Sequence, residues 1–398
     1  MSRLGIRALL LTLVAVPSAV AATLSFERAY ERSTAADQAQ TLSRMARLAV
    51  VIGDLLHETQ KERGSSSVFL SSSGTKFKDE MNAQRRLTDQ GRIRFTELLE
   101  SQRAMWSPHV IANLELANSS LRDIESRRRQ IAAMEIAPAE EMAYYTELNE
   151  RLLDSLGSLV ANTVDVSLRA TTTAYLYFLY AKERTGLERA QLSNVFGTDR
   201  FAPGQLAFVA GLIASQGAFL NIFNKLAPPD VVAFFDKQMS NPAVGEVENM
   251  EKIAMAKTTG FGIDSAVWFG TMTKKINLLK SVEDALAAGI RDGSARINDD
   301  ARRAMAAAFV LAFALLMVAV GATLVLVFKV LRPLQGLRRT VDLVASGDWT
   351  VHFPTQGPRE LRDLGRSLQH MVEAIKINRM MQSQSGGRSV GSRLSLNR

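Results

Sequence analysis

Apolar residues along most of the chain recur every three or four positions, the spacing that places them on one face of an α-helix. The stretch 35–70 is typical, with Leu42, Met45, Leu48 and Ile52 on one stripe. Few segments alternate apolar and polar residues as half-buried strands do. The pattern predicts an all-α fold of packed helices, including one long helical segment over 138–196 and a last helix that begins after a capping Asp264.

Two longer apolar runs, 8–26 and 304–328, contain no charged residue. A helix of either length crosses most or all of a hydrocarbon layer of about 30 Å, so both are predicted transmembrane helices. Ala19-Val20-Ala21 also fits a signal-peptide cleavage site, so the first run is either an anchor or a signal peptide. Both alternatives place the residues that follow outside the cytoplasm. No other long apolar run is expected between them.

Positive charge accumulates at the two ends of the chain. The chain has 48 basic and 40 acidic residues, and its formal net charge is +8. Residues 1–7 include two arginines, and residues 329–398 include 12 basic and 5 acidic residues, so the region between is nearly balanced. Basic flanks face the cytoplasm in membrane proteins. The charge therefore predicts a two-pass inner-membrane protein with 1–7 and 329–398 cytoplasmic and 36–302 periplasmic, and it does not indicate nucleic-acid binding.

Several kinds of site are excluded by residue content. The chain has no cysteine and only four histidines, which are far apart in sequence, and it has no glycine-rich phosphate loop. These features predict no metal site and no cofactor. No nucleophile–base set is visible, so the chain is not expected to be an enzyme.

The sequence Lys-Glu-Arg occurs beside a glycine in two predicted helices, at 61–64 and at 182–186. Glycine inside a helix costs about 1 kcal/mol relative to alanine. Its presence therefore indicates close helix approach or room for a ligand at Gly64 and Gly186.

Arg63 and Arg189 fall on the apolar stripes of these two helices, and Gln216 falls on that of the next helix. Buried guanidinium groups require partners, and their planar N–H forks suit an oxyanion. The sequence therefore predicts a small polar pocket for an anion inside an apolar bundle. The alternative is an ordinary solvated helix surface, with the arginines paired to neighbouring carboxylates (Glu62, Glu183 or Glu188).

The region 51–283 resembles the nitrate- and nitrite-sensing (NIT) domain of bacterial receptors. The resemblance rests on five stretches in the family's order: His57–Ser66, Asn82–Arg86, Lys182–Ala190, Ser215-Gln216 with Phe223, and Trp268-Phe269 with Thr273 and Ile276. It implies an all-helical domain that binds nitrate or nitrite between helices, with Arg63 and Arg189 holding the anion.

One stretch departs from the family pattern. Some members have a further anion-binding arginine where this chain has Glu246–Lys252, which includes no arginine. Lys252 is the candidate replacement, although its ammonium group lacks a planar fork. The expected ligand-binding residues are therefore Arg63, Arg189, Gly64, Gly186, Gln216 and Lys252.

After the second apolar run, two heptad stripes flank a connector that contains Gly347-Asp348 and Pro354. This arrangement over 329–378 resembles a HAMP domain, which implies a parallel four-helix coiled coil in a homodimer. The alternative is a simple pair of amphipathic juxtamembrane helices. Residues 379–398 are expected to form a disordered tail, and His370 has no catalytic domain beside it.

These features together predict a transmembrane receptor that senses nitrate or nitrite in the periplasm and transmits the signal through a HAMP domain. Its cytoplasmic output partner is unknown, and the signalling is of a chemotaxis or two-component type. The alternative function is a membrane-bound structural or interaction subunit whose outer domain binds a protein or peptide.

Overall fold

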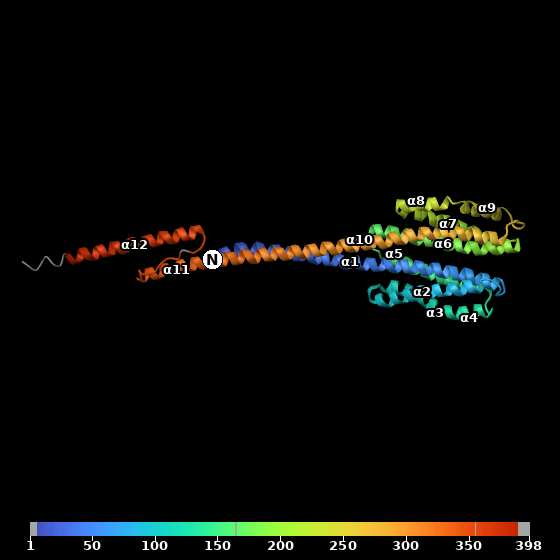
Figure 1. Ribbon diagram of the computed structural model, residues 1–398, viewed down its shortest axis with the longest axis horizontal. Coiled ribbons are helices and arrows are strands. Elements are labelled where there is room, and N and C mark those ends of the chain that lie inside the picture. The colour runs from blue at the N-terminus through green and yellow to red at the C-terminus, as the bar shows by residue number, and fades with distance from the viewer. Residues whose placement is uncertain (1–5, 164, 355, 389–398) are drawn as a thin grey trace, which may run out of the picture. The chain divides into compact units, whose positions relative to one another are not determined.

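The computed structural model describes residues 6–163, 165–354 and 356–388, with side chains between residues 12 and 381 except at position 167. Every regular element within these ranges is helical, which confirms the all-α prediction (Figure 1). The chain divides into two compact units. One unit spans Ala35–Arg302, and the other comprises the residues before and after it.

Ten helices lie wholly or partly in the unit Ala35–Arg302. Their bounds are α1 Ile6–Ser71, α2 Lys78–Gln102, α3 Pro108–Arg122, α4 Ile124–Ala132, α5 Pro138–Ala161, α6 Val166–Thr198, α7 Gln205–Leu226, α8 Pro229–Met239, α9 Pro242–Ala256 and α10 Ser265–Val325. A 3-10 turn, η1, covers Arg103–Met105. Figure 1 shows α2–α4 on one side of the long helices and α7–α9 on the other.

Local sequence explains most helix boundaries. Proline occupies the first position of α3, α5, α8 and α9, where its missing N–H is not needed. Asp264 caps α10 as predicted, because its carboxylate accepts hydrogen bonds from the amides of Ala266 and Val267, both at 2.9 Å.

The prediction of a single helix over 138–196 is wrong. The chain leaves α5 at Asn162 and re-enters a helix at Asp165, whose side chain accepts a hydrogen bond of 2.8 Å from the amide of Leu168. This break contains neither proline nor glycine, and an Asx cap alone is a weak signal in sequence.

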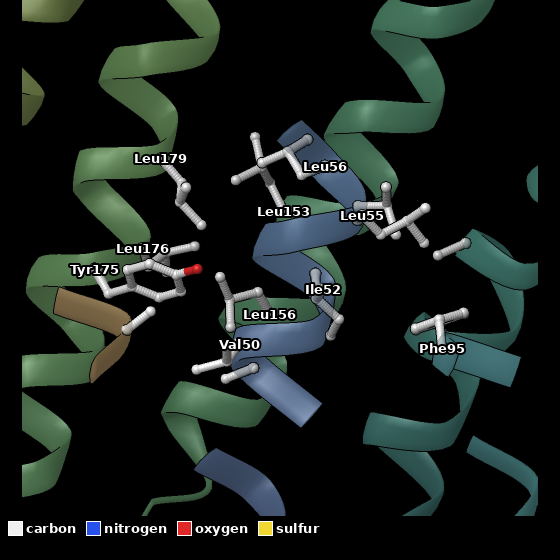
Figure 2. Close-up of a cluster of buried hydrophobic side chains, with 14 of the residues drawn as sticks. Val50, Ile52, Leu55, Leu56, Phe95, Leu153, Leu156, Tyr175, Leu176 and Leu179 are labelled. Atoms are coloured by element: carbon white, nitrogen blue, oxygen red, sulfur yellow. The ribbon is translucent and has the colours of Figure 1, made fainter. Parts of the chain in front are cut away.

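The main core lies where α1, α2, α5 and α6 meet. Figure 2 shows Ile52 and Leu56 of α1 in one cluster of apolar side chains with Leu153 of α5, Leu179 of α6 and Phe95 of α2. These side chains are fully buried, so the apolar stripe predicted for 35–70 faces the interior. A smaller cluster around Trp268 joins the end of α6 to α7, α9 and α10.

Two helices in the described part of the chain have the length and composition to cross a membrane: Gln205–Leu226 and the stretch Ser265–Ala345. The first is α7, an apolar run that the sequence reading did not single out. It packs along α6 and buries Val209, Leu212 and Phe223 on one face, while many of its other residues are exposed. The second includes the predicted span 304–328, whose apolar side chains are mostly exposed. The other predicted span is 8–26. The structure describes side chains only from residue 12, so the start of this span is described by its backbone alone.

The last part of the chain contains a π-helical segment η2 (Leu326–Leu331), then α11 (Arg332–Ala345), a connector, and α12 (Arg359–Arg388). Leu337, Phe353 and Val372 form a small core there. The prediction of a disordered tail from residue 379 is wrong as far as Arg388, because α12 continues to that residue. The rest of the predicted tail, 389–398, lies outside the described residues.

Candidate functional site

Arg63 of α1 and Arg189 of α6 lie opposite each other, and each guanidinium faces a glycine of the other helix. A Cβ atom built on Gly64 would lie 2.9 Å from Nη2 of Arg189, and one built on Gly186 would lie 3.2 Å from Nη2 of Arg63. The two glycines therefore leave the space that the two guanidinium groups occupy, as the sequence predicted.

Arg63 is buried and paired. Its side chain is 3% exposed, and its Nη1 and Nη2 donate to the carboxylate of Glu183 on α6, which is fully buried. Nη1 also donates to the hydroxyl of Thr146 on α5 at 3.2 Å. Of the alternative partners considered from sequence, Glu183 is the one that Arg63 contacts.

Glu183 is held by side chains from two other helices, α1 and α5. Its Oε2 accepts a hydrogen bond of 2.7 Å from Gln60 on α1 and one of 3.3 Å from Asn149 on α5. Asn149 in turn accepts a hydrogen bond of 2.6 Å from Thr59. These contacts fix the carboxylate beside Arg63 and leave it little freedom to turn toward Arg189.

Arg189 has a different environment. Its Nη1 donates to the hydroxyl of Thr273 on α10 at 3.0 Å, and its guanidinium lies over the ring of Phe269, 4.5 Å from the centroid. Within the described residues, no carboxylate lies at ion-pair distance from Arg189. Burial and the nearby positive charge of Arg63 lower the pKa of Arg189 to about 10.

Gln216 of α7 packs against α6, the helix of Arg189, but it contacts side chains other than Arg189. It donates to Glu188 at 2.5 Å and accepts a hydrogen bond of 2.9 Å from Thr185, both on α6. Burial, followed by the charge of Glu251, raises the pKa of Glu188 to about 8. Gln216 therefore holds α7 against α6, next to the turn of α6 that presents Arg189.

The structure does not bring Lys252 to the arginines. The buried side chains of α9 include Val244, Val247 and Ala254, and Lys252 lies outside the face that they form. Lys252 is accordingly exposed. Glu251, the residue before Lys252, pairs with Lys275 of α10 at 3.4 Å.

Two further buried ion pairs flank the site. Glu62 of α1 pairs with Arg128 of α4 at 2.7 Å, and Lys182 of α6 pairs with Glu283 of α10. Lys182 also lies 3.3 Å from Nδ1 of His57, whose pKa is lowered to about 2 by burial and then by Lys182. Of these contact residues, only Glu183 was among the partners considered from the sequence, because it belongs to the second Lys-Glu-Arg run. The contacts with Thr146, Thr273 and Glu283 were not predicted.

Two family models match the chain. A model described as "Nitrate and nitrite sensing" (NIT) matches residues 54–291, more than half of the chain, and a model described as "HAMP domain" matches residues 325–376. The first range includes both arginines, both glycines, Gln216 and Lys252. The second includes α11 and most of α12.

One curated protein and one solved structure are similar to the chain. A "Nitrate regulatory protein" of Klebsiella oxytoca is 27% identical over 251 residues, which are 63% of this chain and 63% of that protein. A structure described as that of the NasR transcription antiterminator is 21% identical, with a TM-score of 0.64, and the match covers 91% of this chain and 98% of that one.

At this identity the structural match supports the fold alone, and the chain spans less than two thirds of its curated relative's length. Both matched domains are sensory and signalling modules rather than catalytic ones. By its match over 54–291, the chain belongs to the nitrate- and nitrite-sensing family and combines that sensing domain with a HAMP domain.

Proposed function

We propose that this chain is a receptor that binds nitrate or nitrite between α1 and α6, with Arg63 and Arg189 as the anion's main contacts. The observation that supports this most strongly is Arg189, a partly buried cation that faces Arg63 and has no carboxylate at ion-pair distance in the described part of the chain. An anion placed between the two guanidinium groups relieves their repulsion and receives charge-assisted hydrogen bonds from both.

The same geometry accounts for the glycines. A planar trioxo anion presents edges that match the N–H fork of a guanidinium group. Glycine at 64 and 186 leaves room for the guanidinium group of the opposite helix, so both guanidinium groups extend into the region between α1 and α6 that we assign to the anion.

Anion binding between α1 and α6 affects α10 through Arg189. Thr273 and Phe269 of α10 contact the guanidinium, and the indole N–H of Trp268 donates to the backbone carbonyl of Arg189 at 3.0 Å. Because α10 continues without a break through Val325, a small shift of Arg189 on anion binding is transmitted along this helix.

The membrane arrangement is part of the proposal. Residues 8–26 and 304–328 cross the inner membrane, 36–302 face the periplasm and 329–378 are cytoplasmic. Exposed apolar side chains along 304–328 support the second span. A homodimer is supported by α11 and α12, whose heptad residues Val341, Leu364 and Met371 are 42–53% exposed and are available to a second copy.

Calorimetric titration of the full chain in lipid nanodiscs tests the proposal. Nitrate and nitrite are each added at constant ionic strength, with chloride as the reference anion. Saturable heat for nitrate or nitrite supports the receptor. If neither anion binds while a stable partner protein co-purifies with the chain, the alternative function as an interaction subunit replaces it.

Gly64→Ala is expected to weaken nitrate binding about tenfold with little loss of stability. The added Cβ meets the mobile end of Arg189, which moves aside but no longer shares the anion with Arg63. Titration gives the affinity, and the thermal melting temperature gives the stability. Gly217→Ala on α7, where the Cβ meets nothing within 4 Å, is the matched control and leaves the affinity unchanged. Equal affinities in the two variants would contradict the proposed position of the anion.

A further inference from the structure

We propose that Glu183 determines which anions the site accepts, because it holds the net charge of the site at one positive unit and so favours singly charged over doubly charged oxyanions. This inference rests on the proposed function, since it concerns the same site. It assigns to a carboxylate a selective role in a site otherwise defined by its arginines.

Glu183 is built into the site rather than adjacent to it by chance. It is fully buried, it contacts both terminal nitrogens of Arg63, and it lies on the helix that also presents Gly186 and Arg189. Hydrogen bonds from Gln60 and Asn149 hold the carboxylate in place. An arriving anion therefore meets Arg63 already paired with a carboxylate, whereas Arg189 has no carboxylate at ion-pair distance among the described residues.

The surrounding ionisable groups do not change this charge. Glu62 is neutralised by Arg128, and Lys182 by Glu283. Burial raises the pKa of Glu188 and Glu141, the other buried carboxyl groups nearby, to about 8 and so favours their neutral forms. Two guanidinium groups and one carboxylate remain, which leave one positive charge.

One positive charge matches a nitrate or nitrite ion. A sulfate ion in the same place leaves one uncompensated negative charge in a site largely shielded from water, where charge interactions are strong and unpaired charge is unfavourable. The site therefore distinguishes these anions by charge as well as by shape.

The test compares sodium nitrate with sodium sulfate, each titrated by calorimetry into the full chain in nanodiscs at pH 7 and matched ionic strength. Three variants are used. Glu183→Gln raises the site's charge to two positive units, and the double variant Arg63→Gln with Glu183→Gln returns it to one. Glu150→Gln removes a half-exposed surface carboxylate, which pairs with Arg184 at 3.4 Å, and serves as the charge control.

The wild type is expected to bind nitrate and not sulfate over the same concentration range. In Glu183→Gln the preference for nitrate over sulfate falls roughly tenfold or more. The double variant binds nitrate more weakly but regains the preference, and Glu150→Gln keeps the wild-type preference.

Sulfate binding as tight as nitrate binding in the wild type overturns the inference while leaving the proposed function in place. An unchanged preference in Glu183→Gln that retains its helical circular dichroism overturns it as well. If Glu183→Gln does not fold, the double variant decides, since it keeps the wild-type charge of the site without leaving Arg63 unpaired: loss of its nitrate preference contradicts the inference. The absence of nitrate and nitrite binding in the wild type is a failure of the proposed function itself.

Discussion

Arg189→Ala is expected to weaken nitrate binding at least about 100-fold, because it removes the cation that has no other ionic partner and its pair of charge-assisted hydrogen bonds. Without nitrate, the melting temperature of this variant is expected to be unchanged or slightly higher. The reason is that Arg189 is partly buried beside Arg63, and both effects lower its pKa and disfavour its charged form. Calorimetry and a melt with and without nitrate measure the two results.

Two further variants serve as controls for the effect of Arg189→Ala on affinity. Arg189→Lys keeps a charge but loses the planar fork, so its affinity falls about tenfold rather than 100-fold. Lys252→Ala removes an exposed cation of α9 and is expected to change the affinity less than about twofold. A larger effect at Lys252 than at Arg189 would show that the anion binds near α9 and not between α1 and α6.

Lys182→Met is expected to lower the free energy of unfolding by about 3 kcal/mol, because it leaves the fully buried carboxylate of Glu283 without its closest cation. Lys280 remains near Glu283 at 2.8 Å, which limits the loss. In a domain of this size, that loss corresponds to a melting temperature roughly 6–12 °C lower. Thermal unfolding followed by circular dichroism measures it.

The matched control is an exposed ion pair in the same unit. Arg151→Met breaks the pair with Glu147 on the surface of α5 and is expected to cost less than about 1 kcal/mol. The double variant Lys182→Met with Glu283→Gln is expected to recover much of the loss, since it leaves no unpaired buried carboxylate. Equal melting temperatures for Lys182→Met and Arg151→Met would contradict the burial of this ion pair.

The sequence was sufficient to predict the all-α fold, the inward direction of Arg63 and the space at the two glycines, but not the break between α5 and α6. Each follows from local spacing: a stripe of apolar residues fixes which face is buried, and a glycine inside a helix marks missing volume. The same logic explains the cap at Asp264, whose effect is confined to one turn.

The partners of the buried charges were not predictable in the same way. Glu183 follows Lys182 directly, so one amphipathic stripe cannot bury both; they are buried together because helices surround α6 on several sides. Glu283 is about a hundred residues away from Lys182, and only the packing of α10 against α6 joins them. Lys252 was expected at the site because some family members have an anion-binding arginine in the same stretch. In the structure the buried face of α9 consists of other residues, and Lys252 is exposed.

The position of bound nitrate in a structure of the full chain tests the central claim most directly. The account predicts a planar anion between Gly64 and Gly186, with oxygens about 3 Å from guanidinium nitrogens of both Arg63 and Arg189. Nitrate bound elsewhere, with the space between these two arginines empty, would contradict it.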